Sequence, residues 1–162
     1  MPSPSVIHLR PYQPADLAAV TALFSASVQG LAAAHYNAAQ RQAWAPPVAD
    51  LPAWHMRLTG LQVLLAHRDG QLAGFIGFSL DGHIDLLFTA PGHARQGFAS
   101  ALYAAAEQRL RAAGARELFT EASLTARPFF ARQGFSEEQA QTVTRGAVNL
   151  QRFVMRKILE PR

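Results

Sequence analysis

Alternating hydrophobic and polar residues predict strands at the start, in the middle and at the end of the chain. The turn signals Asp69-Gly70 and Asp81-Gly82 lie between the middle segments, so these segments are expected to form an antiparallel meander of hairpins. The predicted strands are residues 6–10, 63–66, 72–78, 83–89, 117–122, 135–144 and 147–158.

Apolar residues at intervals of three or four predict helices between these strands. Glycine interrupts the pattern of the first helix and ends the long amphipathic one, and two consecutive prolines cannot continue a helix. The expected helices run from residues 14–16 to Gly30, up to Pro46-Pro47, over residues 53–58, from Gly97 to Gly114, and over residues 126–133.

Together these elements predict one α/β (α+β) domain. Their order is a strand, two helices, three strands, a helix, a strand, a helix and two strands. A mixed, mostly antiparallel sheet flanked by helices accommodates this order. A chain of 162 residues usually forms one domain with a real core. The domain is therefore expected to cover residues 1–162, with an ordered core at roughly residues 6–159.

The amino-acid composition excludes several kinds of functional site and partner. Cysteine is absent, which excludes disulfides, cysteine-containing zinc sites, iron–sulfur clusters and a thiolate nucleophile. The formal net charge is +4, and Lys157 is the only lysine. The arginines are dispersed along the chain, whereas nucleic-acid binders usually concentrate basic residues on one element or tail. We therefore expect no nucleic-acid partner, and an anionic ligand suits this charge at least as well as DNA does.

The sequence also predicts where the protein works. It has no uninterrupted run of roughly 18 apolar residues, the length of a membrane span. The segment Met1–Ser5 lacks the basic start and the apolar stretch of a signal peptide. We therefore expect a cytoplasmic protein without a membrane partner.

One stretch, residues 87–102, combines a strand, a loop of small residues and the start of a helix. The first helical turn exposes unpaired N–H groups and carries a partial positive charge. Small residues at Gly97, Ala99 and Ser100 would let a phosphate approach this backbone, and Arg95 adds a full positive charge. Helix–sheet packing and a solvated arginine explain the same residues without a ligand. The stretch is neither a Walker loop nor a dinucleotide fingerprint.

This stretch resembles the acetyl-CoA-binding motif of the GNAT N-acetyltransferase superfamily. In that motif a central strand and a Pro-containing loop lead to an Arg/Gln-x-x-Gly-x-Gly/Ala turn that opens a long helix. Gly97 and Ala99 stand at its two small positions. Ala94 stands where the first Arg or Gln is usual, so the resemblance is incomplete at this end of the loop.

A second stretch, residues 123–135, is similar to the second GNAT motif, in which Ser123 replaces the usual Asn and Phe130 the usual Tyr. The separation of the two motifs is that of the family, and the order of elements matches over nearly the whole chain. Pairs such as His35-Tyr36 and Trp44-Ala45 resemble the bacterial YafP-like acetyltransferases of this superfamily. The positions that match the second motif are Ala126, Gly134 and Phe135.

The resemblance implies a co-substrate, acetyl-CoA, and a place for each part of it. The central strand is expected to splay from the next parallel strand, with acetyl-CoA in the gap. Backbone groups of Leu87, Phe88 and Thr89 would line the pantetheine and the thioester. Ser123 would contact the pantetheine arm, and Phe130 would pack near the sulfur. The pyrophosphate would lie on the backbone amides of Arg95, Gln96, Gly97, Phe98, Ala99 and Ser100.

The implied reaction is direct transfer of the acetyl group to a primary amine of a small molecule or a protein. It needs a group that removes a proton from the amine and N–H groups that face the developing oxyanion. Many family members protonate the departing thiolate with the tyrosine of the second motif. Phe130 has no hydroxyl, so another group or water must do this.

Asp85 and His83 are the candidate bases. Alternation predicts Asp85, Leu87 and Thr89 on one face of the central strand. A carboxylate in an apolar strand needs a partner or a function, so Asp85 either accepts the proton or binds an arginine or a loop amide. His83 has a suitable ordinary pKa, about 6.5. Glu121, on the adjacent strand, either faces the same cleft or is a surface or salt-bridged residue.

The acceptor is expected to bind between the first two helices. His35, Tyr36 and Trp44 form a polar and aromatic cluster there, although packing in the core would explain Tyr36 and Trp44 equally well. The remaining histidines, His8, His55, His67 and His93, show no metal-ligand spacing, and no metal is expected. Apolar residues of the two C-terminal strands could pair between subunits in a homodimer: Val143, Val148, Phe153 and Val154.

Two other functions remain open from the sequence. The same fold could hold CoA as a weakly catalytic binding or sensor module, since Ala94 and Phe130 depart from the family pattern. A nucleic-acid binder is favoured only by the sequence pI of about 10.3. The identity of the amine and the preferred acyl chain length are not encoded in any motif.

Overall fold

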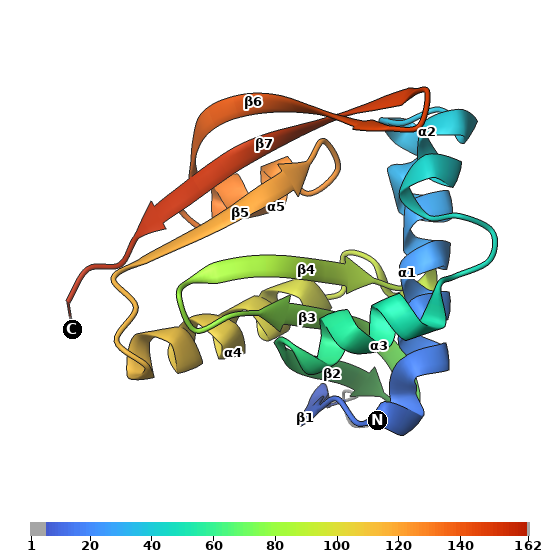
Figure 1. The fold of residues 1–162 in the computed structure, drawn as a ribbon. Coiled ribbons are helices and arrows are strands. Elements are labelled where there is room, and N and C mark those ends of the chain that lie inside the picture. Colours follow the sequence, from blue (N-terminus) through green and yellow to red (C-terminus); the bar gives the residue numbers. More distant parts are fainter. Residues whose placement is uncertain (1–5, 162) are drawn as a thin grey trace.

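The protein is built on a twisted seven-stranded sheet, against which the helices pack (Figure 1). The computed structural model describes residues 6–161; the segment Met1–Ser5, considered above as a signal peptide, lies outside them. The strand order is β1-β2-β3-β4-β5-β7-β6, and each neighbouring pair is antiparallel except β4 and β5. The strands are β1 His8–Pro11, β2 Gln62–Arg68, β3 Gln71–Phe78, β4 His83–Thr89, β5 Glu117–Ser123, β6 Ser136–Arg145 and β7 Val148–Ile158.

Helices pack on both faces of the sheet and make two separate cores. The first core lies under α4 and α5, where Leu102 and Phe130 meet the strands. The second lies under α1, α2 and α3, where Phe24 and Leu58 meet the opposite face. The expected mixed, mostly antiparallel sheet flanked by helices is thus confirmed. The helices are α1 Leu17–Leu31, α2 Ala38–Trp44, α3 Leu51–Thr59, α4 Phe98–Ala112 and α5 Arg127–Arg132, with 3-10 turns at Pro14–Asp16, Ala32–Ala34 and Pro91–His93.

Two details of the helical half differ from the sequence prediction. The three helical segments expected before the second strand are all present as α1, α2 and α3, whereas the predicted order of elements counted only two helices there. Gly30 does not interrupt α1, which continues to Leu31. A Cβ at Gly30 would lie 3.0 Å from Cγ of Pro91, so the glycine lets the turn Pro91–His93 pack closely against the helix.

The helical segment Pro14–Ala34 is long and apolar enough to cross a membrane by length and composition. About two fifths of its most apolar part is buried, and its residues Val20, Leu23, Phe24 and Val28 belong to the second core.

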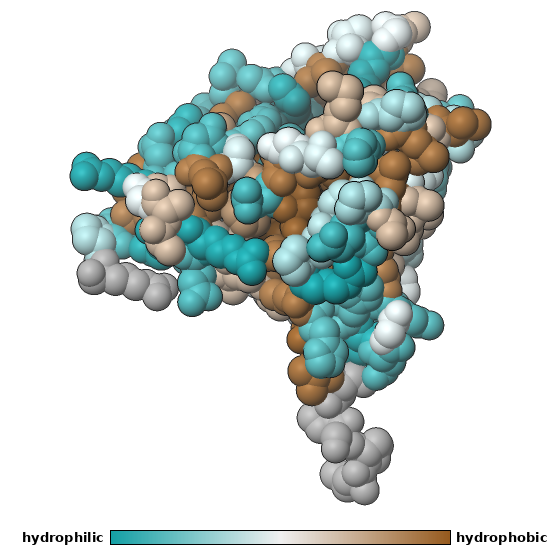
Figure 2. All heavy atoms as spheres, turned by 60° about the horizontal axis from the view of Figure 1, so that its bottom comes forward, coloured by the Kyte–Doolittle hydropathy of each residue, from teal (hydrophilic) through white to brown (hydrophobic). Residues whose placement is uncertain are grey.

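On the face seen in Figure 2, apolar side chains appear between parts of the surface that are mainly hydrophilic.

Strands β4 and β5 pair over only two residues and then diverge. The parallel pairing joins His83 to Phe119 and Ile84 to Thr120, whereas β4 continues to Thr89 and β5 to Ser123. The buried Thr120 hydroxyl donates a hydrogen bond to the Ile84 carbonyl, at 2.8 Å. This bond satisfies the last backbone acceptor of β4 before the strands separate. The expected splay of the central strands is therefore present.

A β-bulge changes which way Asp85 points. Phe78 of β3 pairs with Ile84 and Gly77 with Leu86, so Asp85 is the extra residue. The prediction that Asp85 shares a face with Leu87 and Thr89 was wrong, because the bulge breaks the alternation. Ile84 and Leu87 belong to the α4 side, whereas Asp85 reaches Arg57 of α3 on the opposite side.

The hydrogen bond at the splay yields a stability prediction. Replacing Thr120 with Val keeps the side-chain shape but leaves the Ile84 carbonyl without its donor. An unsatisfied buried polar group costs about 1–3 kcal/mol, so Thr120→Val should lower the free energy of unfolding by about that amount in chemical denaturation. Thr120→Ser, which keeps the hydroxyl, is the control. Equal losses in both variants would mean that packing of the methyl group matters instead of the bond.

Candidate active site

The divergence of β4 and β5 opens a cavity of about 390 Å³ on the α1–α3 side of the sheet. Its floor is β4 and β5, and the β6–β7 hairpin closes it from above, near α2 (Figure 1). Gln40 of α2 donates a hydrogen bond to the Asn149 carbonyl of that hairpin. The cavity is therefore bounded by segments that are far apart in the sequence.

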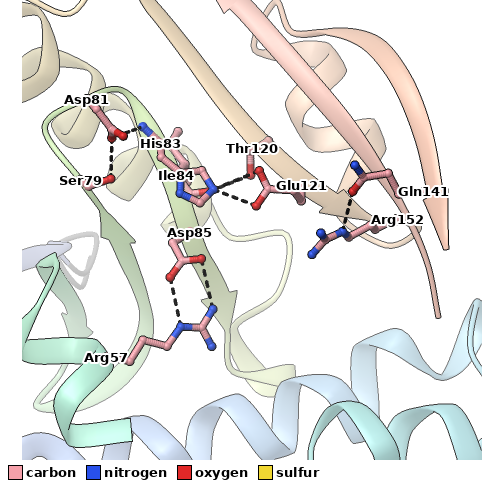
Figure 3. Close-up of polar contacts among 10 residues, drawn as sticks. All are labelled: Arg57, Ser79, Asp81, His83, Ile84, Asp85, Thr120, Glu121, Gln141 and Arg152. Carbon is pink, nitrogen blue, oxygen red and sulfur yellow. Dashed lines mark hydrogen bonds and ion pairs between the residues drawn. The ribbon is translucent and has the colours of Figure 1, made fainter. Parts of the chain in front are cut away.

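Three titratable side chains meet where β4 and β5 separate. One side-chain nitrogen or oxygen atom from each of His83, Asp85 and Glu121 lies within 4.8 Å of the other two. Arg57 donates two hydrogen bonds to Asp85, at 3.1 and 3.2 Å, and His83 Nε2 lies 2.8 and 3.1 Å from the two oxygens of Glu121 (Figure 3). These contacts join the candidate bases into one cluster in which each member already has a protein partner.

The His83–Glu121 contact favours the charged imidazolium. The hydrogen bond that the His83 ring donates to Glu121 raises the pKa of His83 above its ordinary value, and the charges of Glu121, Asp85 and Asp81 act in the same direction. Desolvation of the half-buried ring opposes them. His83 also stacks on Phe119, with ring centroids 4.8 Å apart. The ring is thus held in place, and its proton is directed at Glu121.

The candidate phosphate site lies at the start of α4. Gly97 is the N-cap and has φ of 90°, and Arg95 before it has φ of 60°, a left-handed conformation that L-residues adopt rarely. No heavy atom outside its chain neighbours lies within 4 Å of a Cβ placed at Gly97. The backbone here is open to a ligand, although none of Arg95, Gln96, Gly97, Phe98, Ala99 and Ser100 lines the cavity itself.

Two side chains of this loop have structural contacts. Arg68 of β2 donates a hydrogen bond to Gln96, at 3.0 Å, and Gln96 donates one to the Gly92 carbonyl. Phe98 is 1 % exposed, with the Arg68 guanidinium over its ring. The side chains of Gln96 and Phe98 therefore brace the loop, so that any contribution to a ligand comes from their backbone amides.

Four of the residues expected along the pantetheine arm and the thioester line the cavity: Leu87, Phe88, Ser123 and Phe130. Thr89 does not line it. Ser123 Oγ accepts a hydrogen bond from the Ala126 amide, at 3.0 Å, so its own hydroxyl hydrogen remains available. Phe130 is buried and packs against Phe135.

The expected acceptor residues separate into two groups. Trp44 and Tyr36 line the cavity, with ring centroids 5.4 Å apart. The Tyr36 hydroxyl donates to the Gln151 carbonyl and accepts from the Leu124 amide, and burial raises the pKa of its phenol. His35 is exposed, does not line the cavity, and lies 3.2 Å from Thr125 Oγ. Tyr36 thus ties the first helical region to the C-terminal hairpin.

Several cavity residues were not singled out from the sequence. Arg57 and Trp54 come from α3, and Arg152 comes from β7. Trp54 and Arg57 are three apart on a helix, a spacing that places them on one face, but nothing in the sequence says that this face meets β4. Phe153, considered above for subunit pairing, is buried in the first core; the homodimer stays a prediction.

The raised pKa of His83 makes the stability of the protein pH-dependent. The ion pair with Glu121 stabilises the fold fully below the unfolded-state pKa of about 6.5 and is lost as pH rises through the raised folded-state pKa. Glu121→Gln should therefore lower the melting temperature more at about pH 6 than at about pH 9. Differential scanning fluorimetry at both pH values measures this. A loss that is equal at both would contradict the ion pair.

Comparisons with known proteins agree on a family. The family model described as an acetyltransferase (GNAT) domain matches residues 32–157. The chain is 38 % identical over 142 residues to the uncharacterized N-acetyltransferase YafP of Escherichia coli (strain K12), covering 87 % of this chain and 89 % of YafP. A GCN5-related N-acetyltransferase structure from Rhodopseudomonas palustris, whose description adds "Aminotransferase, Class-II", superimposes with a TM-score of 0.91 at 35 % identity, covering 96 % of this chain and 97 % of that one.

More distant structures share the fold. PaiA N-acetyltransferase from Thermoplasma acidophilum, in complex with coenzyme A, superimposes with a TM-score of 0.78 at 19 % identity, covering 95 % of this chain and 99 % of that one. The family model matches well over half of the residues, and the YafP similarity spans most of both chains. The chain therefore belongs to the GNAT family of N-acetyltransferases.

Proposed function

We propose that this protein transfers the acetyl group of acetyl-CoA directly to a primary amine, in the cavity between β4 and β5. The observation that carries the proposal is the early separation of these strands. It leaves backbone groups of β4 without a partner strand on the β5 side, between the open N-terminus of α4 and the cluster of His83, Asp85 and Glu121. When bound, acetyl-CoA supplies an acyl group activated as a thioester, so no covalent enzyme intermediate is needed.

The start of α4 is suited to the pyrophosphate. Its first amides have no acceptor within the helix, the helix dipole favours an anion there, and Gly97 leaves the space next to them open. Arg95, Gln96 and Ser100 are exposed, so a phosphate could reach the backbone from solvent. We propose that this turn holds the pyrophosphate while Leu87, Phe88 and Thr89 line the pantetheine and the thioester.

The cluster at the splay is suited to accept the proton of the amine. Asp85 is the extra residue of the bulge and faces the cavity, and His83 and Glu121 lie next to it. We propose that Asp85 takes the proton, directly or through water, and becomes a neutral carboxyl next to the His83–Glu121 ion pair. Backbone N–H groups of β4 without a partner in β5 are suited to the developing oxyanion.

The departing thiolate needs another proton source, because Phe130 has no hydroxyl. The Ser123 hydroxyl lines the cavity and has its hydrogen available, so Ser123 or water is our candidate.

A CoA-binding module with little catalysis is the second candidate function. Both oxygens of Asp85 accept hydrogen bonds from Arg57, and this favours a structural role for the carboxylate. CoA binding without acetylation of any amine would support this alternative.

The pyrophosphate site can be tested at Gly97. An added carboxylate about 4 Å from a phosphate repels it by about 1–4 kcal/mol, so Gly97→Asp should weaken CoA binding about tenfold or more in calorimetry. Gly114→Asp is the matched control, since Gly114 also has positive φ and open space at the opposite end of α4. Unchanged CoA affinity in a folded Gly97→Asp variant would place the pyrophosphate elsewhere.

The role of Asp85 can be separated from its ion pair. A general base contributes about 10²–10⁴-fold, so Asp85→Asn should lower turnover by about that factor while CoA affinity stays similar. Arg57→Gln removes the partner and leaves the carboxylate, so it should keep most of the turnover. If Arg57→Gln loses as much as Asp85→Asn, the carboxylate serves to anchor the arginine, and Glu121 becomes the base to test.

A further inference from the structure

Two arginines of the β6–β7 hairpin that line the cavity have no carboxylate partner among the residues that the structure describes. The arginines that line the cavity are Arg57 of α3 and, from the hairpin, Arg145 and Arg152. Arg57 is bound by Asp85, whereas Arg145 and Arg152 form no ion pair with any residue between positions 6 and 161. Arg145 is exposed at the turn of the hairpin, and Arg152 is half-buried in the middle of β7. Arg152 is therefore the better-placed anion ligand.

Gln141 holds Arg152 in position without neutralising it. Arg152 Nε donates a hydrogen bond to the side-chain oxygen of Gln141, at 3.0 Å (Figure 3). An amide oxygen orients the guanidinium but carries no charge, so the Nη groups and the full positive charge remain for another partner. A guanidinium fixed in this way is suited to bind a carboxylate or phosphate with two hydrogen bonds.

The next arginine on the same face of β7 shows the contrast. Arg156 forms ion pairs with Glu117, at 2.7 Å, and with Glu138, at 3.1 Å. Arg152 and Arg156 are four residues apart on β7, an even number, so they project from the same face of the strand. The position outside the cavity is neutralised by two carboxylates, and the position that lines the cavity is held by an amide.

The other wall of the cavity is aromatic. Phe24, Trp44, Trp54 and Phe88 line it. Phe24 lies 4.7 Å from Trp54 and 4.9 Å from Phe88, measured between ring centroids, and Trp44 lies 6.2 Å from Phe88. Such a wall favours an apolar or aromatic body on the acceptor.

We infer that the acceptor is a small primary amine that also carries an anionic group, a carboxylate or a phosphate, and an apolar or aromatic body. Arg152 binds the anion, the aromatic wall covers the body, and the amine faces Asp85. The register permits this, because Arg152 lies directly opposite Ser123, two residues beyond Glu121 on β5. The inference rests on the proposed acetyl transfer, and aromatic amino acids are the simplest compounds of the class.

Pairs of amines that differ only in the anion test this. Release of CoA from acetyl-CoA is measured with phenylalanine against 2-phenylethylamine, and with tryptophan against tryptamine. The corresponding aminophosphonate of phenylalanine distinguishes a phosphate-type anion from a carboxylate. A hydrogen bond to a charged group changes equilibria by about 10–100-fold, so we expect kcat/KM for the preferred anionic member to exceed that of the plain amine by about this factor.

Two variants remove the positive charge in different ways. Arg152→Gln deletes the guanidinium, and Gln141→Glu keeps it but supplies a carboxylate that neutralises it. Both should bring the ratio of kcat/KM within each pair close to one. Arg132→Gln is the control, because Arg132 is exposed on α5 and does not line the cavity, so it loses the same charge and should keep the wild-type ratio.

Binding of the acetylated products tests the anion site separately from the proposed acetyl transfer, because it can be measured without turnover. Calorimetry on the CoA-loaded protein compares N-acetylphenylalanine, its phosphonate analogue and N-acetyl-2-phenylethylamine, and it needs no turnover. Tighter binding of an anionic product, lost in Arg152→Gln, supports the inference even if no amine is acetylated. Equal binding of all three, no binding of any, or a preference that survives Arg152→Gln and Gln141→Glu overturns it, whether or not acetylation occurs.

Discussion

The two-residue pairing between β4 and β5 is the constraint on which the site depends. Backbone N–H and C=O groups inside a protein need partners, and a sheet that opens in its interior removes them. The Thr120 hydroxyl satisfies the last carbonyl before the opening, and the bulge at Asp85 changes the direction of the strand where it leaves its neighbour. The remaining edge of β4 has no partner strand in β5, and this is the edge to which the proposed function assigns acetyl-CoA.

Much of this arrangement could be predicted from the sequence. The strands of the meander followed from alternation and from Asp-Gly turns, and the helix after Gly97 followed from its apolar stripe. The family resemblance predicted the splay of β4 from β5, which is present, and a phosphate loop before α4, which stays a prediction. Periodicity did not predict the bulge at Asp85, because one extra residue does not change the hydrophobic pattern of a mainly apolar strand recognisably. Periodicity also predicted that α1 ends at Gly30. The glycine instead lies inside the helix, where it allows close packing against Pro91.

The charged residues of the cavity were harder to predict, because their pairing is decided by tertiary structure. Asp85 looked isolated in an apolar strand, yet its partner Arg57 lies 28 residues earlier on a helix that packs across the strand. Glu121 and His83 meet only because β4 and β5 are parallel neighbours at this level. Nothing local distinguishes Arg152 from Arg156; the difference is that one has an amide beside it and the other two carboxylates.

The contact between Gly30 and Pro91 links the cavity mechanically to the loop that precedes α4. Helix α1 lines the cavity through Thr21, Phe24 and Ser25, and the same helix rests on the turn that begins the loop leading to Gly97. A shift of α1 that reshapes the cavity therefore also displaces this loop. If the cavity holds the acceptor and the loop holds CoA, as proposed, acceptor specificity is free to diverge through α2, α3 and the C-terminal hairpin, while changes that move α1 are restrained by the need to keep the loop in place.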